Sequence, residues 1–200
     1  ATPGAGPGVG WWMIDVLNFD KAFQGTLAQI GSTLALAGLF FFRKYITEKP
    51  IGFTLAWLTV AGAILSLPTI GLFYGVHEML GVSARTVALV DTTISAPIGA
   101  LSMVPLLTLI ARTCPAGNAG TWFALMASLM NLALSASTLG TKYFNTVWVV
   151  TREVKNSSGA IVTAANYSNV GVLLITTWVI GLVVPLVVIW FFLRKELTKK

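Results

Sequence analysis

The sequence predicts an all-α membrane protein with five transmembrane helices and a partial or interfacial helix at its N-terminal end. Of its 200 residues, 56% are hydrophobic and only 10% are charged, with a mean hydropathy of +0.81. A soluble domain has about 25% charged residues, so this chain has too little polar surface to cover itself. Its apolar runs are continuous rather than alternating, which favours helices over a barrel, and several reach the roughly 20 residues that cross a bilayer.

Residues 1–21 are expected to form an N-terminal segment ahead of a helical bundle at residues 22–200. The segment begins with ATPGAGPGVG, which is too rich in Pro and Gly for a regular helix and lacks the regions of a signal peptide. The apolar run that follows, with Trp11 and Trp12, is too short to span and indicates an interfacial helix or the end of a span. Asp20 is a candidate N-cap for the next helix.

Five apolar runs predict the spans, at about residues 23–42, 51–74, 86–110, 120–148 and 170–193. Pro68 lies inside the second run and Pro185 inside the fifth, and each is expected to kink its helix. Pro97 and Pro105 make the third span an irregular helix. Irregular helices often line the substrate path of transporters, although prolines are common in membrane helices generally.

Residues 147–165 differ from the runs around them. Valine-rich stretches flank the turn sequence NSSG at positions 156–159, a pattern typical of a β-hairpin. From the sequence alone two readings stand: a small hairpin that stands off the outer face, or a disordered loop.

Basic residues gather on one side of the predicted membrane. Eight lie on the face that holds the turns after the first and third spans and the C-terminus, against four on the opposite face. The eight are Arg43, Lys44, Lys49, Arg112, Arg194, Lys195, Lys199 and Lys200. The positive-inside rule therefore predicts a C-terminus on the cytoplasmic side, or its stromal or matrix equivalent. It also accounts for the net charge of +6 without nucleic-acid binding.

Enzyme signatures are missing from the sequence. One His, one Cys and seven acids on separate loops offer neither a metal cluster nor a disulfide framework, and no Gly-rich phosphate loop is present. We therefore expect no enzyme and no identifiable cofactor, with bound lipids or pigments as the molecules that apolar faces allow. His77 and Glu78 are expected in a loop, where a solvated or capping role is favoured over a proton relay.

Asp91 is the leading candidate for a functional side chain. It lies one or two turns inside the third span, and an ionisable residue within the membrane is a functional candidate because burying it is costly. Its carboxylate can accept a proton or hydrogen-bond a heterocyclic N–H group. The alternative is a position near the outer interface, where Thr92, Arg85 or water satisfies it.

Small residues mark one face of the fourth span. Ala127, Asn131 and Ser135 recur every four residues, and Ser128 lies beside them. Small side chains at this spacing let helices approach closely, and the amide can hydrogen-bond across. Helix packing is favoured for this face over cavity lining.

Residues 105–140 read PLLTLIARTCPAGNAGTWFALMASLMNLALSASTLG, and an aspartate precedes them in the same span. An Asp, a Pro-Leu-Leu, a Cys-Pro-x-Gly turn, a Thr-x-Phe-Ala-Leu, a Ser and an Asn follow one another, carried by Asp91, Pro105, Leu106, Leu107, Cys114, Pro115, Gly117, Thr121, Phe123, Ala124, Leu125, Ser128 and Asn131. This pattern resembles the tenth and eleventh spans of the folate–biopterin transporter family in the major facilitator superfamily. The likeness covers roughly residues 12–145.

The resemblance implies half of a transporter. Family members have twelve spans, and this chain is similar to the last five and the end of a sixth. The turn with Arg112, Cys114, Pro115 and Gly117 would lie on the cytoplasmic face. At the position of Ala119 the family usually carries an acid that helps latch that face.

Two functions follow from a half-transporter. One is the C-terminal half of a carrier of pteridines or other organic anions, completed by a missing N-terminal half, with Asp91 as the polar contact and Thr92, Ser95 and Asn131 nearby. The other is a non-transporting structural subunit of a larger membrane complex, in which other membrane subunits or pigments cover its faces. The family occurs in photosynthetic organisms, so a photosynthetic complex and a plastid membrane fit the resemblance.

Overall fold

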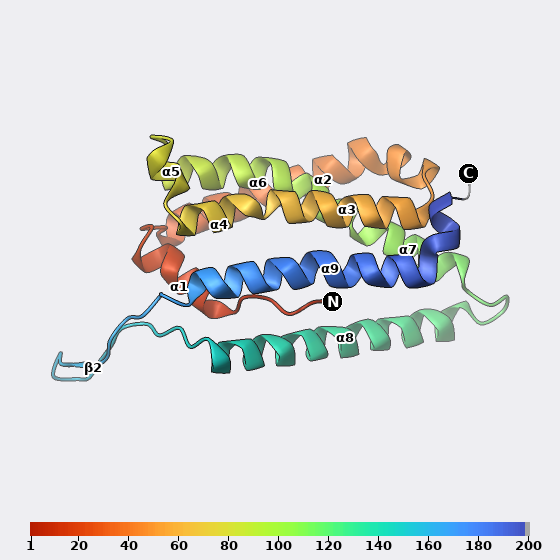
Figure 1. The fold of residues 1–200 in the computed structure, drawn as a ribbon. Coiled ribbons are helices and arrows are strands. Elements are labelled where there is room, and N and C mark those ends of the chain that lie inside the picture. The colour runs from red at the N-terminus through yellow and green to blue at the C-terminus, as the bar shows by residue number, and fades with distance from the viewer. Residues whose placement is uncertain (199–200) are drawn as a thin grey trace.

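The computed structural model describes the backbone of residues 1–198, with side chains for residues 1–42 and 49–192. Its long helices lie side by side, with their ends gathered at two opposite faces (Figure 1). The elements are α1 (Pro7–Asp15), α2 (Lys21–Glu48), α3 (Ile51–Leu65), α4 (Leu67–Phe73), α5 (Val76–Met79), α6 (Ala84–Leu101), α7 (Met103–Arg112), α8 (Ala119–Val147), β1 (Val154–Lys155), β2 (Ile161–Thr163) and α9 (Val170–Thr198).

Within the described part of the chain, five helical stretches are long and apolar enough to cross a bilayer. They are α2, α3 with α4, α6 with α7, α8, and α9. The all-α membrane fold expected from composition is confirmed. Each stretch lies close to its expected range, and α2 continues as helix to Glu48, beyond the expected end at residue 42.

Two of the five stretches are broken near their prolines. Pro68 has no N–H to donate to the carbonyl one turn earlier, and the helix breaks at Ser66, between α3 and α4. The second break, at Ser102, separates α6 from α7 and lies between Pro97 and Pro105. Pro185 lies inside a continuous α9.

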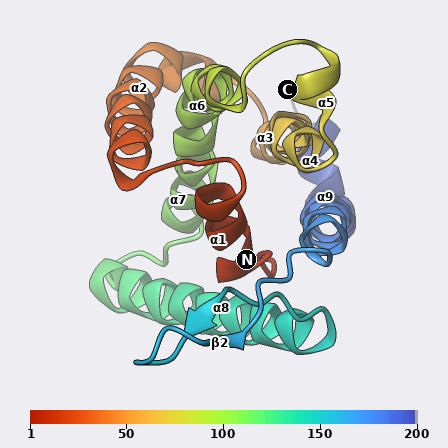
Figure 2. The same cartoon turned by 90° about the vertical axis from the view of Figure 1, so that its left-hand side faces the viewer.

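Close packing in the bundle is concentrated between α2 and α6, and between α3 and α9. Seen from one end, α2, α6 and α7 lie on one side, α3, α4 and α9 on the other, and α1 between them (Figure 2). Gly38 of α2 is buried. Pro97 of α6 packs so closely against it that a larger side chain would not fit at Gly38. Val170 and Leu173 of α9 are fully buried.

The helix α8 stands apart and crosses below the others in the same view (Figure 2). None of its residues is buried. Three polar side chains spaced by four, Ser137, Thr141 and Asn145, hydrogen-bond backbone groups of the extended residues 2–5, which run between α8 and α9 (Figure 1). Irregular backbone at membrane depth needs such partners, since lipid offers none.

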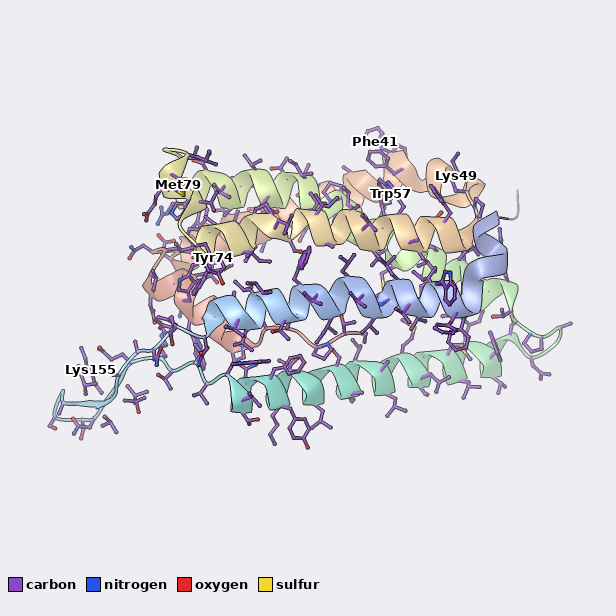
Figure 3. The ribbon with its side chains drawn as sticks, in the orientation of Figure 1. Phe41, Lys49, Trp57, Tyr74, Met79 and Lys155 are labelled. Atoms are coloured by element: carbon purple, nitrogen blue, oxygen red, sulfur yellow. The ribbon has the colours of Figure 1, made fainter. Side chains whose placement is uncertain are left out.

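Exposed aromatic residues lie on both halves of the bundle. Phe41 and Trp57 are exposed on the half that ends at Lys49, and Tyr74 lies toward the other end (Figure 3). Lys49 lies at the same end as Phe41, whereas Lys155 lies far out at the opposite end. Aromatic side chains at both ends are typical of membrane interfaces, where one side of the ring is apolar and the other wet.

The loop between α8 and α9 forms the small hairpin that was one of its two expected readings. The strands β1 and β2 pair antiparallel and extend beyond the helix ends (Figure 1). Asn156 Oδ1 accepts hydrogen bonds from Ser158 N and Ala160 N, and Gly159 has a φ of 83° that completes the turn.

Candidate functional site

Asp91 lies on α6, seven residues after its first residue and therefore about 10 Å into the helix at 1.5 Å per residue. Its Oδ1 is buried and has no hydrogen-bond partner among the described residues. Arg85, expected as one group that could satisfy it, instead donates to Asp20 Oδ2 at 3.1 Å and to the carbonyl of Asn18 at 2.8 Å. A buried carboxylate oxygen without a partner is costly, which makes Asp91 the candidate functional group of this region.

A cavity of about 320 Å³, here called the α3–α6 cavity, opens beside Asp91. Both helix breaks line it, through Ser66 on one side and Ser102 on the other. Thr69 and Ser95 add hydroxyl groups, and apolar side chains of α3 and α6 form the rest of the wall. One carboxylate among several hydroxyls in an apolar wall can orient a small polar ligand through directed hydrogen bonds.

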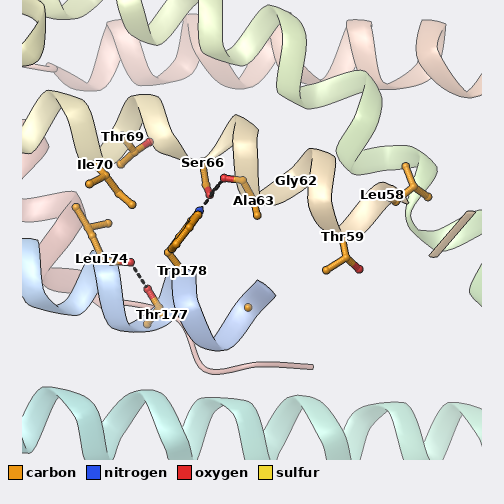
Figure 4. A pocket seen from close by; sticks show the side chains of 11 residues that line it. Leu58, Thr59, Gly62, Ala63, Ser66, Thr69, Ile70, Leu174, Thr177 and Trp178 are labelled. Carbon is orange, nitrogen blue, oxygen red and sulfur yellow. Dashed lines mark hydrogen bonds between the residues drawn. The ribbon is translucent and has the colours of Figure 1, made fainter. Parts of the chain in front are cut away.

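A second cavity, of about 420 Å³, continues this space between α3 and α9 (Figure 4). It shares Ser66 and Thr69 with the α3–α6 cavity, and Trp178 of α9 forms its far wall. The Nε1 of Trp178 donates to the carbonyl of Ala63 at 2.8 Å, and the Ser66 hydroxyl donates to the same oxygen at 2.8 Å. At the helix break, the Ala63 carbonyl therefore accepts a hydrogen bond from α9, and this bond connects α3 to α9 beside the cavity.

The structure brings only part of the predicted site together. Ser95 lines the α3–α6 cavity with Asp91, but Thr92 turns its methyl group toward Gly31 of α2. Asn131 lies exposed on α8, outside the residues that line this cavity.

The small-residue face of α8 is exposed at Ala127, Ser128 and Ser135. The hydroxyls of Ser128 and Ser135 donate to carbonyls one turn earlier in the same helix. Close helix packing by this face stays a prediction. Because the face is exposed, the packing partner would have to be a helix of another chain or of a further part of the protein.

The turn between α7 and α8 lies at the same end of the bundle as the C-terminus (Figure 1). Gly117 adopts a φ of 82°, which favours glycine, while Arg112 is exposed and Cys114 is half-buried. Trp122 Nε1 donates to the carbonyl of Ile110 at 3.0 Å and fixes the start of α8 against α7.

Among the eight basic residues counted for orientation, Lys49 and Arg112 have described side chains. The side chains of Arg43, Lys44, Arg194, Lys195, Lys199 and Lys200 lie outside the described residues. The side of the membrane on which the C-terminus lies therefore stays a prediction.

An ion-pair cluster at the other end joins α1 to the loop that carries the hairpin, and no local sequence pattern indicates it. Arg152 donates to both Asp15 carboxylate oxygens, at 2.9 and 2.7 Å, and the Tyr167 hydroxyl donates to Asp15 Oδ2. These hydrogen bonds lower the pKa of Asp15 below its ordinary value, and the bond from Arg152 has the largest effect. Burial is the main cause that raises the pKa of Tyr167 to about 12, and the nearby Asp15 carboxylate adds to it. The cluster holds this loop on the end of α1.

His77 corrects an expectation from the sequence. It lies in α5, and its side chain is only 11% exposed rather than solvated, whereas the neighbouring Glu78 side chain is 80% exposed. Its Nδ1 is buried without a hydrogen-bond partner in the described structure. A local sequence pattern cannot reveal this, because His77 lines a cavity together with residues of α3, α4 and α6.

Sequence relatives agree with this architecture. The chain matches the model of the BT1 family over residues 9–200. It is 31% identical over 133 residues to the folate-biopterin transporter of Synechocystis sp., which covers 66% of this chain and 27% of that protein. It is 30% identical over 122 residues to probable folate-biopterin transporter 4 of Arabidopsis thaliana, which covers 61% of this chain and 25% of that protein.

The chain thus spans about a quarter of the length of the curated relatives it matches. No solved structure matches it. The family match over nearly the whole chain confirms the resemblance seen in the residues around the α7–α8 turn. With five helices able to cross a bilayer, the chain is an integral membrane protein and belongs to the BT1 family.

Proposed function

We propose that these residues form the C-terminal half of a transporter for a pteridine or related organic anion of the folate and biopterin type. The observation that carries the proposal is the α3–α6 cavity, which Asp91 lines together with serines at two helix breaks. Broken helices that line a cavity are the usual sites of substrate binding in transporters. The names of the relatives supply the cargo class.

Asp91 is the polar contact for the cargo, and Ser95 supports it. The heterocyclic N–H groups of a pteridine can donate to the carboxylate, and hydroxyls can accept or donate beside it. Thr92 and Asn131, on other faces, act on helix contacts or on a neighbouring half rather than on the same ligand atoms. Alternating access needs a second bundle to close the other side of the site, so the N-terminal half is the expected partner.

An uptake assay with labelled biopterin in cells that express the full-length protein tests this proposal. Asp91→Asn should lower uptake by roughly tenfold or more, because a hydrogen bond to a charged group contributes about 1.5–3 kcal/mol. Glu153→Gln is the matched control, since Glu153 pairs with Lys155 in the exposed hairpin. Uptake by Asp91→Asn equal to that of the wild type, at equal surface expression, would show that this site assignment is wrong.

The orientation has its own test. Cys114 is the only cysteine of these 200 residues and lies in the α7–α8 turn, at the C-terminal end of the bundle. With a cytoplasmic C-terminus, a membrane-impermeant maleimide should label Cys114 only after the cells are permeabilised. Cys114→Ser in the full-length protein is the control. Labelling of Cys114 in intact cells would reverse the orientation.

A structural subunit of a larger membrane complex is the second candidate. The absence of any buried residue in α8 favours it, because a membrane helix with small and polar residues on its surface usually packs against another protein. Such a subunit would copurify with other membrane proteins at fixed stoichiometry, and the full-length protein would show no uptake. Uptake of biopterin by the purified protein in liposomes would exclude this alternative.

A further inference from the structure

Two buried polar atoms lack a hydrogen-bond partner among the described side chains, and both belong to titratable groups. They are Nδ1 of His77 on α5 and Oδ1 of Asp91 on α6. A native protein rarely buries such atoms without a reason, and groups that exchange protons are one recognised reason. Their positions relative to each other therefore decide whether they act together.

A series of cavities joins the two groups. His77 lines an outer cavity of about 380 Å³, and Asp91 lines a neighbouring cavity of about 250 Å³. Pro68 and Val87 line both cavities, so the two spaces are neighbours on either side of these residues. Val87 and Asp91 are one turn apart on α6, a separation of about 6 Å along the helix axis. On its other side, Asp91 lines the α3–α6 cavity.

His77 lies where this series begins. Its helix, α5, is at the end of the bundle that carries the hairpin, opposite the C-terminus (Figure 1). The Nε2 of His77 is 3.9 Å from Oε1 of the solvated Glu78, while Nδ1 is buried. The ring therefore has one nitrogen toward solvent and the other away from it.

Few other charged or titratable groups face this route. Glu78 is the only other acid or base that the structure shows beside His77, because the residues lining the outer cavity from α4 and α6 are apolar. The Tyr74 hydroxyl lies against Gly171 of α9, and Arg85 is bonded to Asp20. Around Asp91, the described lining from α3, α4 and α6 is apolar or carries hydroxyls.

We propose that His77 carries protons between the outer face and Asp91, and that proton movement through this pair drives transport. This inference rests on the proposed transport function. Starting from the ring protonated at Nδ1, Nε2 takes a proton from outer water or from Glu78. Nδ1 then gives its proton, through water in the cavities, to the Asp91 carboxylate, which becomes neutral. The ring is left protonated at Nε2, and a turn of the ring that exchanges the places of the two nitrogens presents this N–H to the cavities for the next cycle.

Histidine suits this role because it exchanges protons near neutral pH. Protonation of Asp91 on the outer side would change the charge of the cargo site, so that binding and release of an anion would depend on the proton. The direction of coupling follows: acid outside should favour inward movement of the anion with a proton.

Liposomes that contain the purified full-length protein test the role of His77 with labelled biopterin. Two rates are measured: accumulation driven by an acid exterior, and counterflow between equal pH values, which needs no net proton movement. His77→Gln should lower gradient-driven accumulation by about a hundredfold or more, the usual scale of proton-transfer catalysis, and change counterflow by less than about twofold. Met79→Gln, at an exposed position in the same helix, is the matched control and should change neither rate.

The outcomes separate the two proposals. Unchanged gradient-driven accumulation in His77→Gln, or equal losses of accumulation and counterflow, would overturn the proton route and leave transport intact. Wild-type protein without counterflow would overturn the transport function, and this inference with it. His77→Asn provides the second variant if His77→Gln does not elute as a folded protein.

Discussion

Replacing Gly38 by alanine should weaken the contact between α2 and α6, the most extensive helix pair of the bundle. A Cβ at Gly38 would lie 2.6 Å from Cβ and 2.7 Å from Cα of Pro97. Carbon atoms in contact prefer about 3.5–4.0 Å, so the overlap is about 1 Å. The atoms in its way belong to a proline ring and backbone within α6, and they cannot turn aside as a flexible side chain would.

The size of the effect follows from a comparison within α2. Alanine is favoured over glycine in a helix by about 1 kcal/mol, which applies equally at Gly25 and Gly38. Gly25 has nothing within 4 Å of an added Cβ, so Gly25→Ala should be neutral or stabilising. Overpacking costs about 1–3 kcal/mol. Gly38→Ala should therefore be about 1–3 kcal/mol less stable than Gly25→Ala.

Thermal unfolding of the full-length protein in detergent, followed by tryptophan fluorescence, measures this difference. Gly31→Ala completes the series, because its added Cβ would meet Thr92 at 3.4 Å, an ordinary contact. The expected order of unfolding temperature places Gly38→Ala lowest and Gly25→Ala highest. If Gly38→Ala unfolds at the same temperature as Gly25→Ala, the reasoning from the α2–α6 contact is wrong.

Three further predictions concern groups outside the α2–α6 contact. Trp178→Phe removes one donor from a carbonyl at the helix break and should cost about 0.5–1.5 kcal/mol in unfolding experiments, whereas Trp57→Phe, at an exposed ring, should cost less. Arg152 lowers the pKa of Asp15 below 3.8, so the ion pair between them stabilises the fold fully above about pH 4 and is lost as pH falls through the lowered pKa. Hydrogen exchange of the loop that carries Arg152 would detect this loss. The pKa of Tyr167, raised to about 12, keeps its phenol neutral until pH rises through that value; Asp15→Asn should let phenolate absorbance appear at lower pH.

The spans were predictable because composition alone decides which stretches enter a bilayer. The break at Ser66 was also within reach, since Pro68 removes the donor for a carbonyl one turn earlier. The hairpin stayed one of two readings until its turn geometry was known. Contacts such as Asp15 with Arg152, which are 137 residues apart in sequence, have no local signal at all.

For the candidate site, depth in the membrane singled out Asp91, and the structure places a cavity beside it. The helical period could not say which way Thr92 and Asn131 face, because a period defines a face without naming its neighbour. His77 was expected in solvent, since a short polar stretch carries no information about the helices that cover it. Burial depends on how distant segments pack, and that information appears only in the fold.

The isolation of α8 has a consequence for how sequence changes are tolerated. Leucines on its outer surface, such as Leu125 and Leu132, are half or more exposed, so any apolar replacement should be accepted there unless a neighbouring chain covers them. Ser137, Thr141 and Asn145 should be far less permissive, because each holds backbone that lipid cannot satisfy. A saturation mutagenesis scan along this helix would therefore locate the contact with a neighbouring chain, as the stretch of leucines at which substitutions are not tolerated.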